Sequence, residues 1–159
     1  MIIFYEPADG IHERFEVGKG RLRASEIQII ERTADARWDD IKGQIREGDL
    51  GAMRVVVWAL KKRSQPALRF AEFDPYEGEL RSRFDEREVR GFAEAFVEKF
   101  SDDPDQLAEA FDELRESAAD AEVADKVIAE VTAPKDPAPA PEPPGELAEM
   151  PSEASPTDG

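Results

Sequence analysis

Cysteine is absent from this chain of 159 residues, and histidine occurs once, at His12. Without cysteine the protein has no disulfide framework, no thiol nucleophile and no cysteine-based metal site. A single histidine also excludes zinc sites that need two, and the sequence places no acid or nucleophile to make His12 catalytic. These absences favour a binding protein over an enzyme, with no metal or cofactor.

Long apolar runs and basic residues are scarce as well. No apolar run approaches the roughly 20 residues that cross a bilayer, and the start, MIIFYEPADG, lacks the basic region and cleavage site of a secretory signal. With 37 acidic against 21 basic residues the net charge is -16. Because phosphate binding needs a positive surface, this charge disfavours nucleic acid as a partner. We expect a soluble intracellular protein that binds neither nucleic acid nor a membrane.

Composition divides the chain into three parts. Residues 1–75 are expected to form a compact helical domain with an N-terminal β-hairpin, and residues 76–131 a helical hairpin extension. Residues 132–159 hold 8 of the 12 prolines, six acids and no aromatic residue. Such a segment buries too little apolar surface to fold, which predicts a disordered tail rich in proline and acid. The fold class is therefore mainly α, with a small β element.

A β-hairpin is predicted for the first twenty residues. Residues 2–5 are a β-branched and aromatic run, and a turn sequence follows them. The alternation after that turn places Ile11, Phe15 and Val17 on one face. Since a lone hairpin is marginal in water, this face must pack on the segments that follow.

Helical periodicity begins at Ser25. A helix containing Trp38 ends at Gly48, and Asp49 can cap the next helix. That next helix is apolar nearly all round from Val55 onwards, so we expect it at the centre of the domain. Apolar residues from Leu68 to Phe73 are expected to fold back on this centre.

Two further helices are predicted in the extension. Asp85 and Glu88 form a capping pair for the first. Asp103, followed by proline, starts the second, whose apolar stripe continues to Val131 through a drift of phase.

Two groups of residues are candidates for partner binding. Phe92, Phe96 and Phe100 repeat at helical spacing. They are core if their helix packs on its neighbours, and a groove-binding surface if it stands apart. The second group is the only compact basic cluster, which either makes intramolecular pairs or meets an acidic partner; it consists of Lys61, Lys62 and Arg63.

The order of several residues within residues 1–75 points to a known family. These residues are Glu31, Thr33, Trp38-Asp39-Asp40, Gly48-Asp49-Leu50, the run from Val57 to Arg63, Pro66 and Leu68-Arg69-Phe70. The pattern resembles that of tail assembly chaperones of long-tailed, siphovirus-like phages, particularly those that infect actinobacteria. Ala34 departs from it, because the family usually has glycine there. The matching positions Trp38, Trp58, Pro66 and Phe70 are expected to be core.

The resemblance implies a function. Such chaperones bind the tape measure protein and keep it soluble in the host cytoplasm while tail tube subunits polymerise around it, and the mature virion lacks them. They are made in a short form, which this chain resembles, and a longer frameshifted form that recruits the tail tube protein. Residues 133–135 can be encoded by the slippery heptamer C-CCA-AAG. Self-association is a further interaction open to such a protein.

Two other functions remain open at this point. The chain is compatible with a structural head-tail or minor tail protein that stays in the virion. A small hydrolase that uses buried carboxylates is the third candidate. Virion composition separates the first of these from a chaperone, and loss of an activity on neutralising one carboxylate would identify the last.

Overall fold

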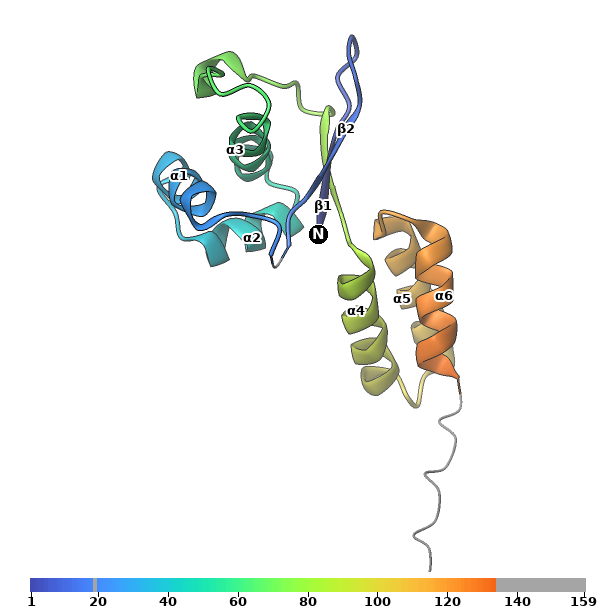
Figure 1. The fold of residues 1–159 in the computed structure, drawn as a ribbon. Coiled ribbons are helices and arrows are strands. Elements are labelled where there is room, and N and C mark those ends of the chain that lie inside the picture. The colour runs from blue at the N-terminus through green and yellow to red at the C-terminus, as the bar shows by residue number, and fades with distance from the viewer. Residues whose placement is uncertain (19, 134–159) are drawn as a thin grey trace, which may run out of the picture.

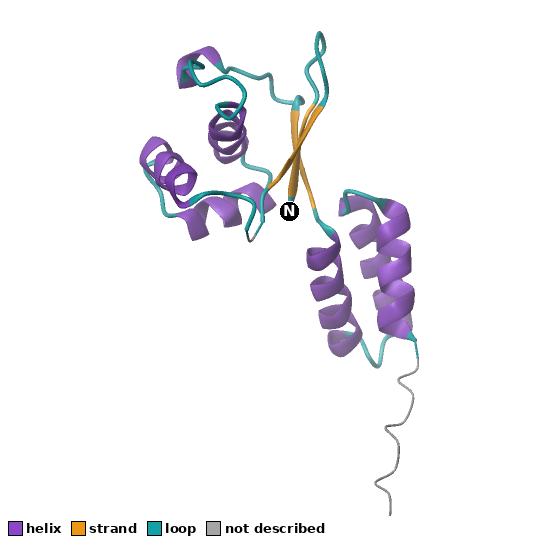
Figure 2. Cartoon of the chain, viewed as in Figure 1, coloured by secondary structure: helices purple, strands orange, loops and turns teal. Residues whose placement is uncertain are grey.

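The computed structural model describes residues 1–18 and 20–133, and in these ranges the chain is mainly helical, with one small sheet (Figures 1 and 2). This fold class is the predicted one. The elements are β1 (Ile2–Tyr5), β2 (Glu13–Glu16), α1 (Ala24–Ala34), α2 (Trp38–Arg46), α3 (Leu50–Lys61), a 3-10 turn (Phe70–Glu72), β3 (Leu80–Arg83), α4 (Glu86–Lys99), α5 (Pro104–Ser117) and α6 (Ala121–Thr132). The predicted tail begins inside α6, and its residues 134–159 lie outside the described ranges.

The sheet has three antiparallel strands in the order β2-β1-β3. Ile3 of β1 pairs with Phe15 on one side and with Ser82 on the other. The hairpin was predicted, but β3 was not, because its four residues LRSR include two arginines and resemble a polar linker. Leu80 is nevertheless only 5% exposed. Strands β2 and β3 form the two edges of the sheet, and both carry charged side chains, which alternate with uncharged ones along β3.

One predicted position of the hairpin is wrong. Ile11 lies in the loop before β2 and is 84% exposed, because the strand begins only at Glu13. Val17 is buried and Phe15 packs at the margin of the core, as the alternation predicted.

The core of the N-terminal lobe lies between the sheet and α1, α2 and α3. Helix α3 has eight buried residues, so its predicted central place is confirmed. Asp49 caps it, since its carboxylate accepts a hydrogen bond of 2.7 Å from the Ala52 N–H. The preceding Gly48 has a φ of +84°, a conformation that favours glycine and ends α2. Phe73 is buried against this core, as predicted for the segment after α3.

The C-terminal lobe is a bundle of three helices, α4, α5 and α6, with its own apolar cluster. The predicted helical hairpin is therefore wrong, because this part of the chain forms three helices and not two. The chain becomes extended at Ala118, and Asp120 then caps α6 by accepting hydrogen bonds from the N–H groups of Glu122 (3.0 Å) and Val123 (3.2 Å). The drift of phase in the apolar stripe marks this break.

The two lobes meet where β3 leads into α4 (Figure 1). Because β3 completes the N-terminal sheet, the lobes divide near Phe84 and not at the predicted boundary of 75/76. The amino group of Met1 forms ion pairs with Asp85 and Glu88 at the start of α4. None of the helices in residues 1–18 and 20–133 is long and apolar enough to cross a membrane.

Candidate partner-binding surfaces

The three phenylalanines of α4 form a ladder of neighbouring rings. The ring centroids of Phe92 and Phe96, and of Phe96 and Phe100, are 6.2 Å apart, and Phe84 extends the ladder at 4.8 Å from Phe92. All are half-buried, and Phe92 and Phe96 pack against the apolar cluster of the bundle. The ladder therefore lies at the margin of a core, and α4 does not stand apart from its neighbours.

The basic cluster after α3 does not form one surface. Lys61 makes an ion pair with Glu13, and its Nζ lies 5.0 Å from the centre of the Tyr5 ring. The Nζ of Lys62 donates a 2.7 Å hydrogen bond to the carbonyl of Pro66. These two cations contact different parts of the N-terminal lobe.

Arg63 is paired with Glu26 of α1. Its guanidinium donates hydrogen bonds of 2.7 and 2.8 Å to the two carboxylate oxygens and a third, of 2.8 Å, to the carbonyl of Arg21. Glu26 is 8% exposed. Hydrogen bonding from Arg63 lowers the pKa of the Glu26 carboxyl, against a smaller opposing effect of burial. All three cations of the cluster thus have partners within the chain.

The residues from Trp58 to Phe70, which carry part of the resemblance, form one packed block. The Trp58 indole N–H donates a 3.1 Å hydrogen bond to the carbonyl of Leu68, and the Trp58 ring meets Phe70 edge to face at 5.3 Å. The Arg54 guanidinium also lies over the Phe70 ring, 4.3 Å from its centre. The expectation that Pro66 is core is wrong, because it lies exposed in the turn after α3. The block holds the segment after α3 against that helix.

Trp38 has a different setting. It is half-buried at the start of α2, where it packs against the N-terminal core, and its backbone N–H donates a 2.8 Å hydrogen bond to Glu31. It also lines a groove of about 1300 Å³ between the two lobes. Trp38 thus packs against the core with part of its surface and faces the groove with another part.

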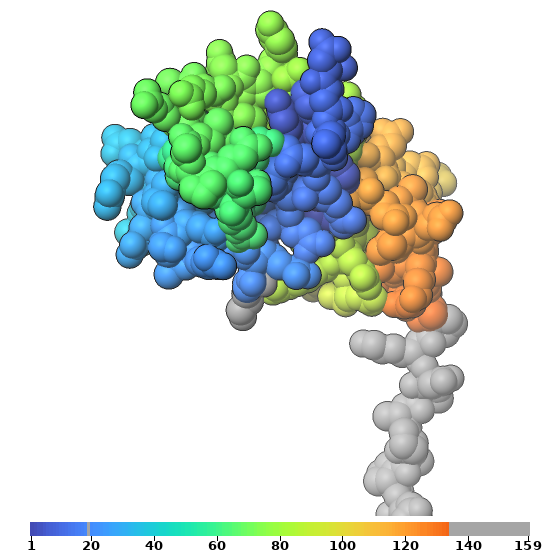
Figure 3. Space-filling view, turned by 45° about the horizontal axis from the view of Figure 1, so that its top comes forward, coloured from blue at the N-terminus to red at the C-terminus, as the bar shows by residue number. Residues whose placement is uncertain are grey.

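We call this cavity the interlobe groove. The connection from β2 to α1 and helix α2 form one wall, and the first turns of α4 and α6 form the other. Figure 3 shows the hollow between the blue N-terminal residues and the yellow-green α4. Apolar side chains from both lobes lie along it: Leu22, Ile27, Trp38, Phe84 and Val123.

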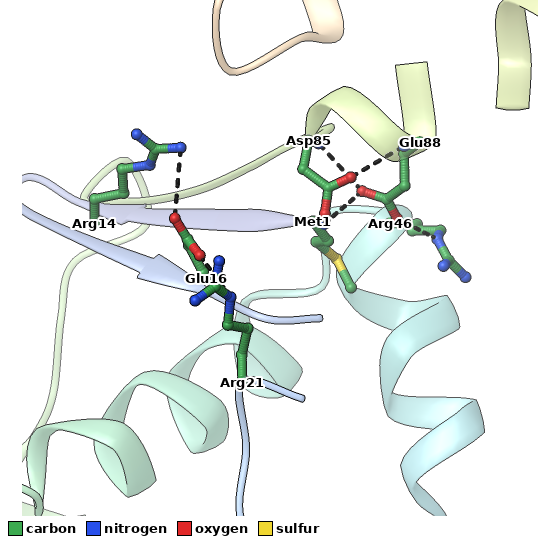
Figure 4. A network of polar contacts seen from close by, with 7 residues as sticks. All are labelled: Met1, Arg14, Glu16, Arg21, Arg46, Asp85 and Glu88. Carbon is green, nitrogen blue, oxygen red and sulfur yellow. Dashed lines mark hydrogen bonds and ion pairs between the residues drawn. The ribbon is translucent and has the colours of Figure 1, made fainter. Parts of the chain in front are cut away.

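Charge in the interlobe groove differs from that of the chain. Six basic and five acidic residues line it, whereas the whole chain has 21 basic and 37 acidic residues. Figure 4 shows that Glu16 lies between Arg14 (3.9 Å) and Arg21 (2.9 Å). In the described ranges Arg87 is exposed and has no ion-pair partner. The lining of the groove is therefore nearly balanced in charge, whereas the chain as a whole is acidic.

Two acidic residues at the start of α4, Asp85 and Glu88, form ion pairs within the chain. Glu88 lies 2.7 Å from the Met1 amino group and 3.3 Å from the Nε of Arg46 (Figure 4). Burial of Asp85 raises its pKa, but hydrogen bonds from the Met1 amino group and the Glu88 N–H outweigh burial and lower it. These pairs reduce the negative charge that the groove presents to a ligand.

A smaller hollow of about 240 Å³ continues the groove along the outer face of the sheet. Phe4, Arg81 and Arg83 line it together with Ala119, which also borders the interlobe groove. Within the sheet Phe4 is flanked by Arg14 and Arg81. The outer face thus adds arginines around an aromatic ring.

The sequence did not reveal the groove, because its lining comes from segments that are far apart along the chain. The arginines that alternate along β3 are the one local signal that could have indicated a charged sheet face.

The interlobe groove brings apolar side chains together with charged ones. Within residues 1–18 and 20–133, no three acidic or histidine side chains are placed to hold a metal. Three of the carboxylates that line the groove, those of Glu16, Asp85 and Glu88, form ion pairs with cations of the chain, and apolar side chains line the groove beside them. Such a surface suits a polypeptide with mixed apolar and charged side chains.

In comparisons with known proteins, no family model matches the sequence, and no curated protein or solved structure matches it either.

Proposed function

We propose that this protein is a phage tail assembly chaperone that binds the tape measure protein and keeps it soluble during tail assembly. The order of the motif residues from Trp38 to Phe70 supports this function, as does the packed block that Trp58 and Phe70 form. The observation on which it chiefly rests is the interlobe groove, which is lined by both apolar and charged side chains.

The size of the groove suits a helical client. An α-helix about 10 Å wide rises 1.5 Å per residue, so 1300 Å³ corresponds to roughly ten residues of helix. A tape measure protein is a long helical chain with apolar stretches. Binding such stretches one at a time would cover surfaces that otherwise aggregate.

The protein acts in the host cytoplasm as the short form of two products. Its net charge of -16 keeps chaperone-coated complexes apart through like-charge repulsion. The longer, frameshifted product recruits tail tube subunits, and neither product remains in the mature virion.

Co-expression with the tape measure protein, followed by pull-down, tests the proposal. We expect the full chain to retain the tape measure protein in the soluble fraction. Trp38→Ala should weaken capture about 30-fold, in line with an aromatic residue central to an interface. Tyr76→Ala, which alters an aromatic residue that is 81% exposed outside the groove, is the matched control and should have no effect.

Two results would contradict this function. If the wild-type chain fails to capture or solubilise the tape measure protein, the chaperone function is wrong. If mass spectrometry of purified virions finds the chain in many copies, the alternative of a structural head-tail or minor tail protein replaces it. A melting temperature for Trp38→Ala close to that of the wild type would attribute its weaker capture to the groove.

A further inference from the structure

The two lobes are joined by few contacts. Their apolar clusters share no buried residue, and the chain passes from one lobe to the other where β3 leads into α4. In the described ranges, the ion pairs that join the lobes are those of the Met1 amino group with α4 and that of Arg46 with Glu88. Lobes that share so small an interface move relative to one another unless a contact fixes them.

Met1 is held firmly on the N-terminal lobe. Its side chain belongs to the apolar cluster of that lobe and is 4% exposed. Its carbonyl accepts a 2.9 Å hydrogen bond from the Val17 N–H, and the next residue, Ile2, pairs with both β2 and β3. The sheet therefore fixes the position of the amino group.

The carboxylates that bind this amino group are held just as firmly on the other lobe. Asp85 and Glu88 form the capping box of α4, in which each accepts a hydrogen bond from the backbone N–H of the other, of 3.3 Å to Glu88 and 3.0 Å to Asp85. The Met1 amino group contacts both carboxylates and lies 2.7 Å from Glu88 (Figure 4). An ammonium group has a full positive charge and three N–H donors, so it can bind two carboxylates at once.

We propose that the free amino group of Met1 is a latch that holds the two lobes at a fixed angle, and that an acyl group on it opens the latch. Acylation replaces the ammonium by a neutral amide with one N–H, and the amide carbonyl presents a further acceptor oxygen to the two carboxylates. The attraction between opposite charges is then lost. Met1 also lines the interlobe groove, so the shape of the groove depends on the state of this amino group.

Spin-label distances in the full chain test the latch. The absence of cysteine allows two nitroxide labels to be placed through Gln28→Cys on α1 and Glu109→Cys on α5, at exposed positions outside the groove. Cleavage of a fusion directly before Met1 gives the free amino group. Expression with the host deformylase inhibited leaves an N-formyl group, which intact mass confirms. We expect the distribution of interlobe distances to be about twice as broad with the formyl group, because unfixed lobes move.

Variants of the carboxylates show whether the formyl group acts through the ion pairs. Asp85→Asn combined with Glu88→Gln removes both negative charges but keeps side chains that can cap α4. This variant should have a broad distribution with the free amino group, and formylation should broaden it no further, because both changes remove the same contact. Asp103→Asn combined with Glu98→Gln makes the same change at the cap of α5 and on the exposed face of α4 and should keep the narrow distribution.

Two outcomes would overturn the latch. One is an equal distribution of distances in the free and formylated chains. The other is a formyl effect of the same size in the variant that lacks both carboxylates, which would assign it to the bulk of the group. A label pair within the N-terminal lobe, at Gln28→Cys and Ala67→Cys, should give the same distances in every form and so show that this lobe stays folded.

The effect on the client rests on the proposed function and is measured separately. The formylated chain should capture the tape measure protein about fivefold less well, since a looser groove is less preorganised. If formylation broadens the distances but the free chain captures no tape measure protein, the latch stands and the proposed function is wrong. If the free chain captures it and formylation leaves the distances unchanged, the latch is wrong and the proposed function stands.

Discussion

Trp58 shows how one side chain can join two segments of the N-terminal lobe. It lies on α3 and is 8% exposed, yet its indole N–H and its ring both contact the segment after the helix. The central helix and the segment that covers it therefore depend on the same residue.

Trp58→Ala should lower the free energy of unfolding by roughly 3–5 kcal/mol, because a large buried aromatic ring is replaced by a cavity. Trp58→Phe keeps most of the ring contact but removes the hydrogen bond to Leu68, so it should cost about 1 kcal/mol. Urea unfolding monitored by circular dichroism measures both. Equal stability of the alanine variant and the wild type would mean that Trp58 is not buried.

Glu26 is the one charged residue that is buried in the described part of the chain. The Arg63 guanidinium lowers its pKa in the folded state. A carboxyl with a lowered folded pKa adds stability above its unfolded pKa, near 4.5, and this stability disappears as the pH falls through the folded pKa.

Glu26→Gln should therefore destabilise the protein by about 1.5–3 kcal/mol at pH 7, since a charge-assisted pair of hydrogen bonds is replaced by a neutral one. The difference from the wild type should shrink as the pH is lowered from 5 to 3. Glu98→Gln, on the exposed face of α4, is the control. A difference that stays constant with pH would contradict the assigned role of the carboxylate. Thermal melts at several pH values provide the measurement.

Four of the helices, α3 to α6, begin at an aspartate that caps them. Asp49, Asp85 and Asp103 each accept a hydrogen bond from the backbone N–H three residues later, as their sequence context predicted. Asp120 does the same for α6, but it lies inside a stripe that could be interpreted as one long helix.

Asp120→Ala should cost about 1 kcal/mol, the usual effect of removing a helix cap. Glu109→Ala, in the middle of α5 on an exposed position, is the matched control and should change stability little. Differential scanning calorimetry would measure both effects. If the two variants melt alike, the break between α5 and α6 does not depend on this cap.

Features that depend on one segment were predictable, and features that depend on distant segments were not. The caps and the buried α3 follow from neighbouring residues. Strand β3 forms because Leu80 meets Tyr5 of β1, 75 positions earlier in the chain. The groove likewise combines Leu22 and Trp38 with Phe84 and Val123. Neither pairing leaves a periodic signal in its own segment.

At the scale of the whole molecule, two apolar cores are joined by a small number of links. The N-terminal cluster and the C-terminal cluster share no buried residue. Between them lie the chain itself at Phe84, the ion pairs of the Met1 amino group and the pair of Arg46 with Glu88. The lobes should therefore respond separately to a mutation in one core.

Leu114→Ala should destabilise the C-terminal bundle by about 2–5 kcal/mol, because Leu114 is 3% exposed in its cluster. Both tryptophans lie in the N-terminal lobe, so their fluorescence reports on that lobe alone. On heating, we expect helical circular dichroism to fall at a lower temperature than tryptophan fluorescence changes. Ile41→Ala, in the other core, should lower the fluorescence transition instead. Coincident transitions in both variants would show that the lobes unfold as one unit.

The charged residues along β2 and β3 affect whether strands of other molecules can add to the sheet. A strand from a neighbouring molecule would have to align its backbone beside a row that contains Glu13, Arg14 and Glu16 on one side, or Arg81 and Arg83 on the other. Such rows discourage the addition of strands to an open sheet. Polymerisation through β-strand exchange is therefore disfavoured even at high local concentration, and contacts between copies would have to use helical surfaces.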